Sequence, residues 1–190
     1  MDLNERKHHS ENGDWEWFKE FAGIGMPSNY YTFHLISRIM TENPQIQCIV
    51  ELGTYWGSMA VYLGLIGIRR GIPVYTFDKV DQLRHRTKLL FQALRINFHS
   101  LDIFEYRDIV KEIFGQRITY LICDNGNKAD EFYEFGRALT PGSVISVHDY
   151  GTEFYDEDAR RLSDIRSIEP FHPEEWTKHN VQFATWKIVE

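Results

Sequence analysis

Short apolar runs alternate with segments of helical periodicity through the middle of the chain. Five of these runs are predicted to be strands, and four of the five are dense in Val, Ile, Leu, Phe, Tyr or Cys, as is typical of strands covered on both faces. The third run is patchier. The predicted strands are Gln47–Leu52, Pro73–Phe77, Ile96–Leu101, Ile118–Cys123 and Ser143–Val147.

Helical patterns occupy the intervals between the later strands. Asp81–Leu94 carries an apolar stripe at helical spacing, and Asp102–Phe114 opens with the capping-box pair Asp102 and Glu105. Lys128–Leu139 is followed by Thr-Pro-Gly, which ends the helix. Strands and helices in this rhythm predict an α/β fold, a Rossmann-like doubly wound sheet that is mostly parallel with right-handed crossovers.

The last 35 residues have a different pattern. Asp156–Asp164 is predicted to be one short helix, followed by strands over Ile165–Phe171 and Val181–Val189. About ten residues, including His172-Pro173, connect the two strands. We therefore expect an antiparallel hairpin that closes the sheet, with an antiparallel C-terminal strand.

The opening segment, residues 1–45, is rich in aromatic side chains. It is predicted to form two helices, around Trp15–Phe21 and Tyr30–Met40, separated by a Gly-Ile-Gly-Met-Pro stretch. Such helices would pack on the sheet edge, cover the site or form the contact face of a homodimer. Residues 46–190 would form the ligand-binding domain, and the whole chain one compact unit.

Length and charge limit the possible partners. A chain of 190 residues suits one domain with a full core, and a net charge of −7 is unfavourable for binding a phosphate backbone, so we expect no nucleic-acid partner. The longest apolar stretch, Ala60–Ile68, is too short to span a membrane, and the N-terminus has no signal-peptide pattern. Cys48 and Cys123 lie in predicted strands and have no metal-ligand spacing. We expect a cytoplasmic protein without membrane contact.

An acidic residue stands at or near the end of every one of the five predicted strands. In open parallel sheets, ligands bind outside the carboxyl ends of the strands, so these acids would share one edge. Aspartate is also a common helix cap and turn residue, and this alternative applies especially to the third acid. The five acids are Glu51, Asp78, Asp102, Asp124 and Asp149.

The first strand leads into the turn Glu51-Leu-Gly53-Thr-Tyr-Trp-Gly57-Ser58. Glycines there allow a sharp turn and close approach of a ligand. The turn lacks the G-x-G-x-x-G spacing of dinucleotide sites, and a carboxylate beside it repels a pyrophosphate. It suits a ligand with an amino group and a sulfonium, namely S-adenosylmethionine. Asp78 is placed to bind two ribose hydroxyls, which alone would fit NAD equally well.

Together these motifs resemble the class I S-adenosylmethionine-dependent methyltransferases. The resemblance covers roughly residues 46–150, and the Glu-Leu-Gly-Thr-Tyr and Asp-Asn-Gly-Asn stretches are similar to small-molecule O-methyltransferases of the macrolide-sugar, rhamnosyl and cephalosporin-type group. The resemblance assigns Glu51, Gly53 and Ser58 to the methionine end, Asp78 to the ribose, and Asp102 with Ile103 to the adenine. The remaining expected cofactor contacts are Thr54, Gly57 and Asp124.

The resemblance also raises a choice between metal and histidine catalysis. Several relatives bind a divalent cation such as Mg²⁺ through acids that match Asp124 and Asp149, and such a cation lowers the pKa of an acceptor hydroxyl. The pattern departs at Tyr150 and Asn127, where relatives often carry a further ligand or a histidine base. His148 is the other candidate base. In a regular strand, His148 and Asp149 would face opposite ways.

The sequence therefore predicts methyl transfer to an oxygen atom of a small-molecule acceptor, since no further domain is present to hold a macromolecule. Two alternatives stay open. One is a binding protein that retains the cofactor pocket without catalysis, and the other is an NAD-dependent oxidoreductase on a similar sheet.

Overall fold

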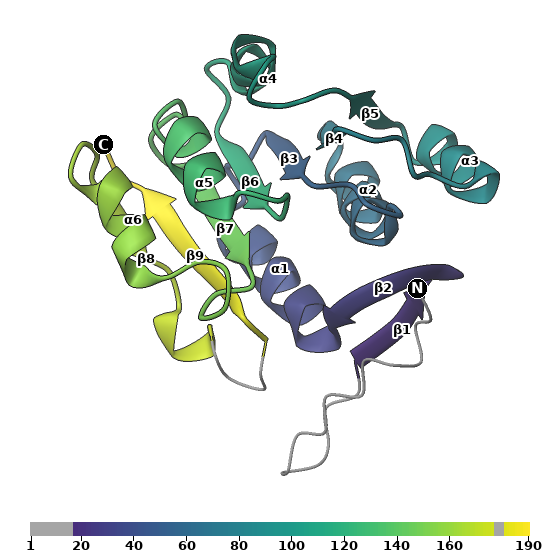
Figure 1. The fold of residues 1–190 in the computed structure, drawn as a ribbon, viewed down its shortest axis with the longest axis horizontal. Coiled ribbons are helices and arrows are strands. Elements are labelled where there is room, and N and C mark those ends of the chain that lie inside the picture. Colours follow the sequence, from purple (N-terminus) through teal and green to yellow (C-terminus); the bar gives the residue numbers. More distant parts are fainter. Residues whose placement is uncertain (1–16, 177–180) are drawn as a thin grey trace.

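The computed structural model describes residues 17–176 and 181–190. At its centre is a seven-stranded sheet of order β5-β4-β3-β6-β7-β9-β8 (Figure 1). The first five of these strands run parallel, whereas β9 pairs antiparallel with both β7 and β8. The strands are β3 (Cys48–Leu52), β4 (Val74–Asp78), β5 (Ile96–Ser100), β6 (Thr119–Cys123), β7 (Val144–His148), β8 (Ile168–Pro170) and β9 (Phe183–Ile188). The predicted α/β class and the antiparallel C-terminal strand are confirmed.

Helices cover both faces of the sheet (Figure 1). Successive residues of a strand point to opposite faces of the sheet and enter two separate hydrophobic cores. In β3, Val50 and Leu52 belong to the core beside α4, α5 and α6. Ile49 belongs to the core beside α1, α2 and α3. The helices are α1 (Tyr30–Glu42), α2 (Ser58–Arg70), α3 (His85–Ala93), α4 (Arg107–Phe114), α5 (Lys128–Gly136), α6 (Asp156–Ser163) and the 3₁₀ turn η1 (Pro173–Glu175). The fold is therefore doubly wound.

Two helices begin later than predicted because an aspartate closes a local turn ahead of each. Asp81 Oδ1 accepts a hydrogen bond from the Leu83 amide at 3.0 Å, and α3 starts only at His85. Asp102 Oδ1 accepts from the Phe104 amide at 2.9 Å, and α4 starts at Arg107. Short polar side chains compete in this way with helical hydrogen bonding.

The N-terminal segment differs from the prediction. Residues 17–21 form a strand, β1 (Trp17–Phe21), instead of a helix, and it pairs antiparallel with β2 (Ile24–Asn29); Trp15 lies outside the described residues. The two residues of the turn, Ala22 and Gly23, have φ of 53° and 74°. Positive φ at both positions is the turn geometry that matches the twist of a hairpin.

The second N-terminal helix is confirmed as α1. Asn29 Oδ1 caps it by accepting a hydrogen bond from the Tyr31 amide at 2.8 Å. Both strands of the preceding hairpin contact α2, so this segment packs on the domain. Among the described residues, no helix is long and apolar enough to cross a membrane.

The C-terminal hairpin is present, but its first strand is shorter than predicted. The amides of Ile165 and Arg166 both donate to the Leu162 carbonyl and continue the end of α6. Strand pairing therefore begins only at Ile168, which lies opposite Ile188.

Candidate functional site

Four of the predicted site residues lie on one face of the sheet at its carboxyl edge. Side chains alternate along a strand, and residues two apart share a face. Glu51 shares a face with Ile49, and His148 shares one with Val144; both of these apolar residues belong to the core beside α1, α2 and α3. Asp78 and Asp124 lie on this same face by the same alternation. The four predicted residues, from four neighbouring strands, therefore lie on one face at the carboxyl edge of the sheet.

The glycine turn after β3 is bound to the neighbouring strands. Gly53 has φ of +104°, and its amide donates to the Phe77 carbonyl at 2.8 Å. A Cβ at this position would lie 2.3 Å from the Asp124 carbonyl oxygen. The close approach of the chain after β6 therefore requires glycine at this position, whether or not a ligand also contacts it.

The later part of the turn packs against α3. Gly57 has φ of +85° and precedes α2, where a Cβ would lie 2.8–3.0 Å from side chains of Thr87, Phe91 and Leu83. Ser58, the first residue of α2, is buried. Gly57 thus allows the helix to start close to its neighbour.

Asp78 connects the glycine turn to the end of β4. Its Oδ2 accepts a hydrogen bond from the Tyr55 amide at 2.7 Å, and its Oδ1 accepts one from the Val80 amide at 3.1 Å. Each carboxylate oxygen has two lone pairs, so each retains capacity for one hydroxyl donor. The geometry is compatible with two further bonds to a ribose.

Glu51 is buried beneath the turn, with 1% of its surface exposed. It accepts a hydrogen bond from Thr76, whose hydroxyl also lies 2.6 Å from the Thr54 hydroxyl. Burial raises the pKa of Glu51 well above its usual range; the Thr76 hydrogen bond opposes this shift, and the nearby acids Asp124 and Asp78 add to it. A bound cation would favour the charged form of this carboxyl.

A cavity of about 180 Å³ lies on the other side of the strand ends. Both residues expected at the adenine, Asp102 and Ile103, line it, and Lys79 forms an ion pair with Asp102 at 2.8 Å. The volume is smaller than pockets for whole drug-sized ligands, about 300–1,000 Å³, and fits part of a ligand. The other lining residues are Phe104, Asn125, Gly126, Asn127 and Glu131.

His148, Asp149 and Asp124 form a compact cluster. His148 Nδ1 lies 3.0 Å from Asp149 Oδ1 and 3.5 Å from Asp124 Oδ1. The strand is not regular at this point: β7 ends at His148, and Asp149 has φ of +61°. This left-handed residue turns its side chain back beside His148, so the expectation that the two face opposite ways does not apply.

The electrostatics of the cluster favour a charged imidazole. Burial alone would lower the pKa of His148, but the negative charges of Asp124 and Asp149 outweigh it and raise the pKa above its usual value. Both of these contacts are made by Nδ1, and no partner among the described residues is found for the other ring nitrogen, Nε2. In the neutral form of the ring, that nitrogen is the one available to accept a proton from a ligand.

Lys128, which the sequence analysis did not single out, belongs to the same cluster. Its Nζ lies 3.0 Å from Asp149 Oδ2, 2.7 Å from Glu153 Oε2 and 3.7 Å from Asp124 Oδ1. It also donates to the Asn125 carbonyl at 3.2 Å. The only sequence signal is a lysine four residues after Asp124, which is not specific.

The fit of a divalent cation depends on these contacts. Ligand atoms of Asp124, His148 and Asp149 all lie within 4.8 Å of one another, as a metal site requires. However, the Lys128 ammonium already contacts the carboxylates of both acids. A hard cation would need those oxygens at 2.0–2.6 Å, and its charge would be repelled by the ammonium. With Lys128 in this position, the residues do not fit a metal ion.

The two residues that depart from the family pattern lie outside this cluster. The Asn127 side chain caps α5 by accepting a hydrogen bond from the Asp130 amide. The Tyr150 hydroxyl donates to Asp156 Oδ1 at 2.7 Å. Each side chain therefore has a structural partner.

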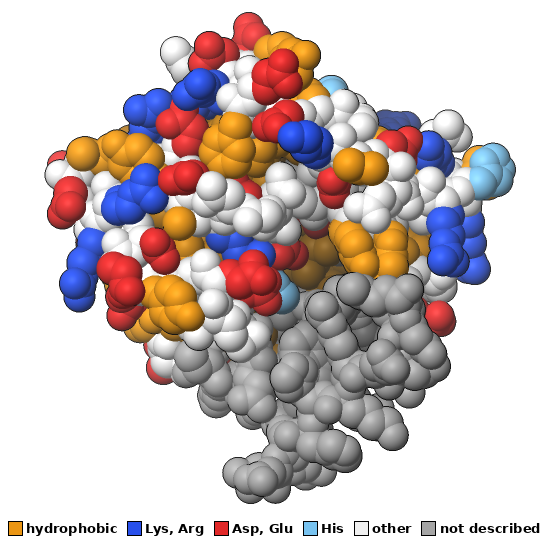
Figure 2. All heavy atoms as spheres, in the orientation of Figure 1, with side chains coloured by type: hydrophobic (Ala, Val, Ile, Leu, Met, Phe, Trp, Pro, Cys, Tyr) orange, Lys and Arg blue, Asp and Glu red, His pale blue; other side chains and the backbone are white. Residues whose placement is uncertain are grey.

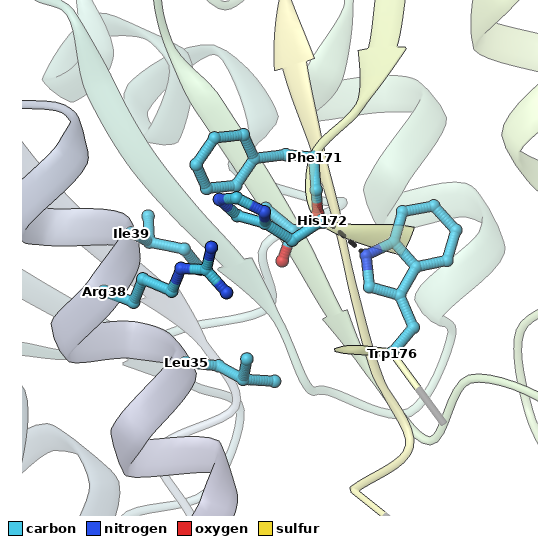
Figure 3. A pocket seen from close by; sticks show the side chains of 7 residues that line it. Leu35, Arg38, Ile39, Phe171, His172 and Trp176 are labelled. Carbon is cyan, nitrogen blue, oxygen red and sulfur yellow. Dashed lines mark hydrogen bonds between the residues drawn. The ribbon is translucent and has the colours of Figure 1, made fainter. Parts of the chain in front are cut away.

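A second, much smaller pocket lies between α1 and the segment after β8 (Figure 3). Leu35 and Arg38 of α1 line one side of it, and Trp176 closes the other, where its indole N–H donates to the Phe171 carbonyl at 3.0 Å. Its volume of about 10 Å³ is just room for one water molecule. Its lining includes none of the predicted site residues, so we place the candidate site at the carboxyl edge.

No protein-family model matches the sequence, and neither does any curated protein. Solved structures do match. The apo form of CmcI is similar with a TM-score of 0.65 at 15% identity, over 90% of this chain and 76% of that chain. CmcI with Mg-SAM gives 0.64 at 13% identity, over 100% and 85%.

CalS11, a calicheamicin methyltransferase, gives a TM-score of 0.57 at 11% identity, over 83% of this chain and 77% of that chain. Identities this low show a shared fold. The chain has the Rossmann-like fold of class I methyltransferases.

Proposed function

We propose that this protein binds S-adenosylmethionine at the carboxyl edge of its sheet and transfers the methyl group to an oxygen of a small-molecule acceptor. One observation carries the proposal. Glu51, Asp78 and Asp124 lie at or next to the carboxyl ends of neighbouring strands, on the same face of the sheet. They surround a glycine turn whose Tyr55 amide donates a hydrogen bond to Asp78. The likeness in fold to CalS11, a calicheamicin methyltransferase, supports the same reading.

Each part of the edge suits one part of that cofactor. Asp78 would accept hydrogen bonds from the ribose hydroxyls, and the cavity beside Ile103 would receive the adenine. Glu51 would face the positive charge of the methionine end. A dinucleotide would instead bring a pyrophosphate next to Glu51 and Asp124, which is electrostatically unfavourable.

The bound cofactor supplies an electrophilic methyl group on a sulfonium, so the residues of the protein need only bind, orient and deprotonate. His148 is the candidate base. In its neutral form, Nδ1–H donates to Asp149 Oδ1, which leaves Nε2 to accept the proton of an acceptor hydroxyl. Asp149 holds the ring in that orientation.

The distribution of charged side chains on the surface supports a small-molecule acceptor and not a polyanion. Lys and Arg side chains are interspersed with Asp and Glu over the face shown in Figure 2, without a continuous basic patch. The net charge is −7. A nucleic-acid partner requires clustered positive charge.

Calorimetric titration with S-adenosylhomocysteine tests the cofactor directly, with NADH as the competing ligand. We expect the wild-type protein to bind S-adenosylhomocysteine and not NADH. Asp78→Ala should weaken that binding by about 1.5–3 kcal/mol, roughly 10- to 150-fold, because it removes a charged acceptor.

Asp108→Ala is the matched control, since this aspartate is exposed in the first turn of α4. It should leave the affinity unchanged. Binding of NADH in preference, or equal affinities for wild type and Asp78→Ala, would contradict the proposal.

A further inference from the structure

Lys128 is buried at a position where a lysine is unfavourable. It is 6% exposed and is the first residue of α5. Lysine is almost never fully buried without a partner, and a positive charge in the first turn opposes the helix dipole. Its burial there therefore requires compensation from nearby groups.

Three carboxylates and one carbonyl provide that compensation. The three ammonium protons are satisfied by Asp149 at 3.0 Å, Glu153 at 2.7 Å and the Asn125 carbonyl at 3.2 Å, and Asp124 lies at ion-pair distance, 3.7 Å. Burial alone would lower the pKa of Lys128, but the acids outweigh it and raise it. The lysine remains charged at any ordinary pH.

All of these partners are oxygen atoms, the donors that a hard divalent cation selects. We propose that the Lys128 ammonium is the resident cation of this site and takes the place of a divalent metal between Asp124 and Asp149. The inference rests on the proposed function for its catalytic meaning, since it makes methyl transfer by this protein independent of metal. Lys128 is then a positioning residue.

The consequence for the reaction follows from the donor count. Because all three ammonium protons are in use, Lys128 has none to offer to an acceptor hydroxyl. Its effect passes through Asp149, whose Oδ2 it holds while Oδ1 faces His148 Nδ1. Removal of the acceptor proton then falls to His148 instead of a metal-bound oxygen.

Direct Mn²⁺ binding, followed by electron paramagnetic resonance and calorimetry, tests the inference without any acceptor. We expect wild-type protein to bind no Mn²⁺ at the cluster. Lys128→Met keeps the chain length and removes the charge, so Asp124, Asp149 and Glu153 lose their counter-ion. This variant should bind one Mn²⁺ with a Kd of roughly 10⁻⁴ M or tighter, as weak oxygen-donor sites do.

Two further variants locate that binding. Lys128→Met combined with Asp149→Asn should lose the Mn²⁺ again. Lys111→Met is the matched control, because Lys111 forms a comparable part-buried ion pair with Glu134 on α5, away from the strand ends. It should bind no more Mn²⁺ than wild type.

Two results would overturn the inference. The first is that the wild-type protein binds Mn²⁺ and that Asp149→Asn abolishes this binding. This result can be obtained even if no Lys128 variant folds. The other is a folded Lys128→Met that binds no Mn²⁺. S-adenosylhomocysteine titrations of the same samples separate this question from the proposed function. If Lys128→Met gained Mn²⁺ binding but no sample bound the nucleoside, the inference about Lys128 would stand and the proposed methyltransferase function would be refuted.

Discussion

His148 Nδ1 lies 3.0 Å from Oδ1 of Asp149, although the two residues are adjacent in the chain. The positive φ of Asp149, +61°, makes this contact possible by ending the strand at His148. An aspartate adopts this backbone region more readily than most residues other than glycine. The geometry holds the imidazole with its second nitrogen free of protein partners among the described residues.

The first prediction concerns the charge of that imidazole. Its pKa should exceed the usual value of about 6.5, because the acids outweigh the effect of burial. Asp149→Asn removes one of those acids and should lower the pKa of His148. Nuclear magnetic resonance titration of the histidine ring signals checks this, with His148→Gln to assign the resonance.

Asp108→Asn, far from the cluster, should leave that titration unchanged. If the His148 pKa did not fall in Asp149→Asn, the assigned role of Asp149 would be wrong.

The second prediction separates two costs of replacing a glycine. Gly53 and Gly71 both have positive φ, +104° and +68°, but an added Cβ meets the Asp124 carbonyl at 2.3 Å in the first case and no atom within 4 Å in the second. Gly71→Ala should cost about 1 kcal/mol of unfolding free energy for backbone strain alone. Gly53→Ala should cost at least about twice as much.

Urea denaturation of both variants measures the difference. Gly53→Ala should also weaken S-adenosylhomocysteine binding, because the end of β6 must move. Equal stabilities of the two variants would mean that β6 does not constrain the turn.

The third prediction is a pH dependence of stability from Glu131. This side chain is buried, and its two oxygens accept hydrogen bonds from the Asn125 and Asn127 amides at 3.2 and 3.1 Å. Burial raises its pKa to about 7, although both hydrogen bonds favour the charged form. The folded state thus holds a proton that the unfolded state releases near its ordinary pKa of about 4.3.

Protonated Glu131 therefore contributes its whole stabilisation of the folded state at low pH. The free energy of unfolding should fall by up to roughly 3 kcal/mol as the pH rises from about 4 to 7. Glu131→Gln should be less sensitive to pH over this range in urea denaturation. Glu112→Gln, an exposed glutamate of α4, is the control and should follow wild type. An identical pH profile for wild type and Glu131→Gln would refute this assignment.

The fourth prediction links cofactor binding to Glu51. Burial raises the pKa of the Glu51 carboxyl in the free protein, and a cationic ligand next to it lowers that pKa because it favours the carboxylate. Binding of S-adenosylmethionine should release a proton, and affinity should increase with pH. Calorimetry in two buffers of different ionisation enthalpy measures the release.

Glu51→Gln should abolish the proton release. Release that persists in this variant would mean that another group titrates on binding.

Much of the fold was predictable from the sequence because apolar strands and acidic strand ends recur at regular intervals. Predicting the strands β3, β4, β6 and β7 and the acids at their ends needed only that pattern. The N-terminal hairpin was not predictable in the same way: residues 17–21 read Trp-Phe-Lys-Glu-Phe, a span without alternation and too short to separate strand from helix. Its turn depends on Ala22 adopting a positive φ, which is unusual for alanine.

The candidate site was only partly predictable for a similar reason. Parallel strands bring Glu51, Asp78 and Asp124 to one edge, which is a property of the sheet. Lys128 contacts Asp149 and Glu153 because Asp149 turns back at the end of β7 and because Glu153 follows in the next loop. No local sequence pattern encodes contacts between residues separated by more than 20 positions.

The most direct test of the central claim, that this edge binds an S-adenosyl nucleoside, is a crystal structure with S-adenosylhomocysteine. We predict that the adenine occupies the cavity beside Ile103, that both ribose hydroxyls donate to Asp78, and that the amino group faces Glu51. A nucleoside bound away from Asp78, or no bound nucleoside at a saturating concentration, would contradict the account.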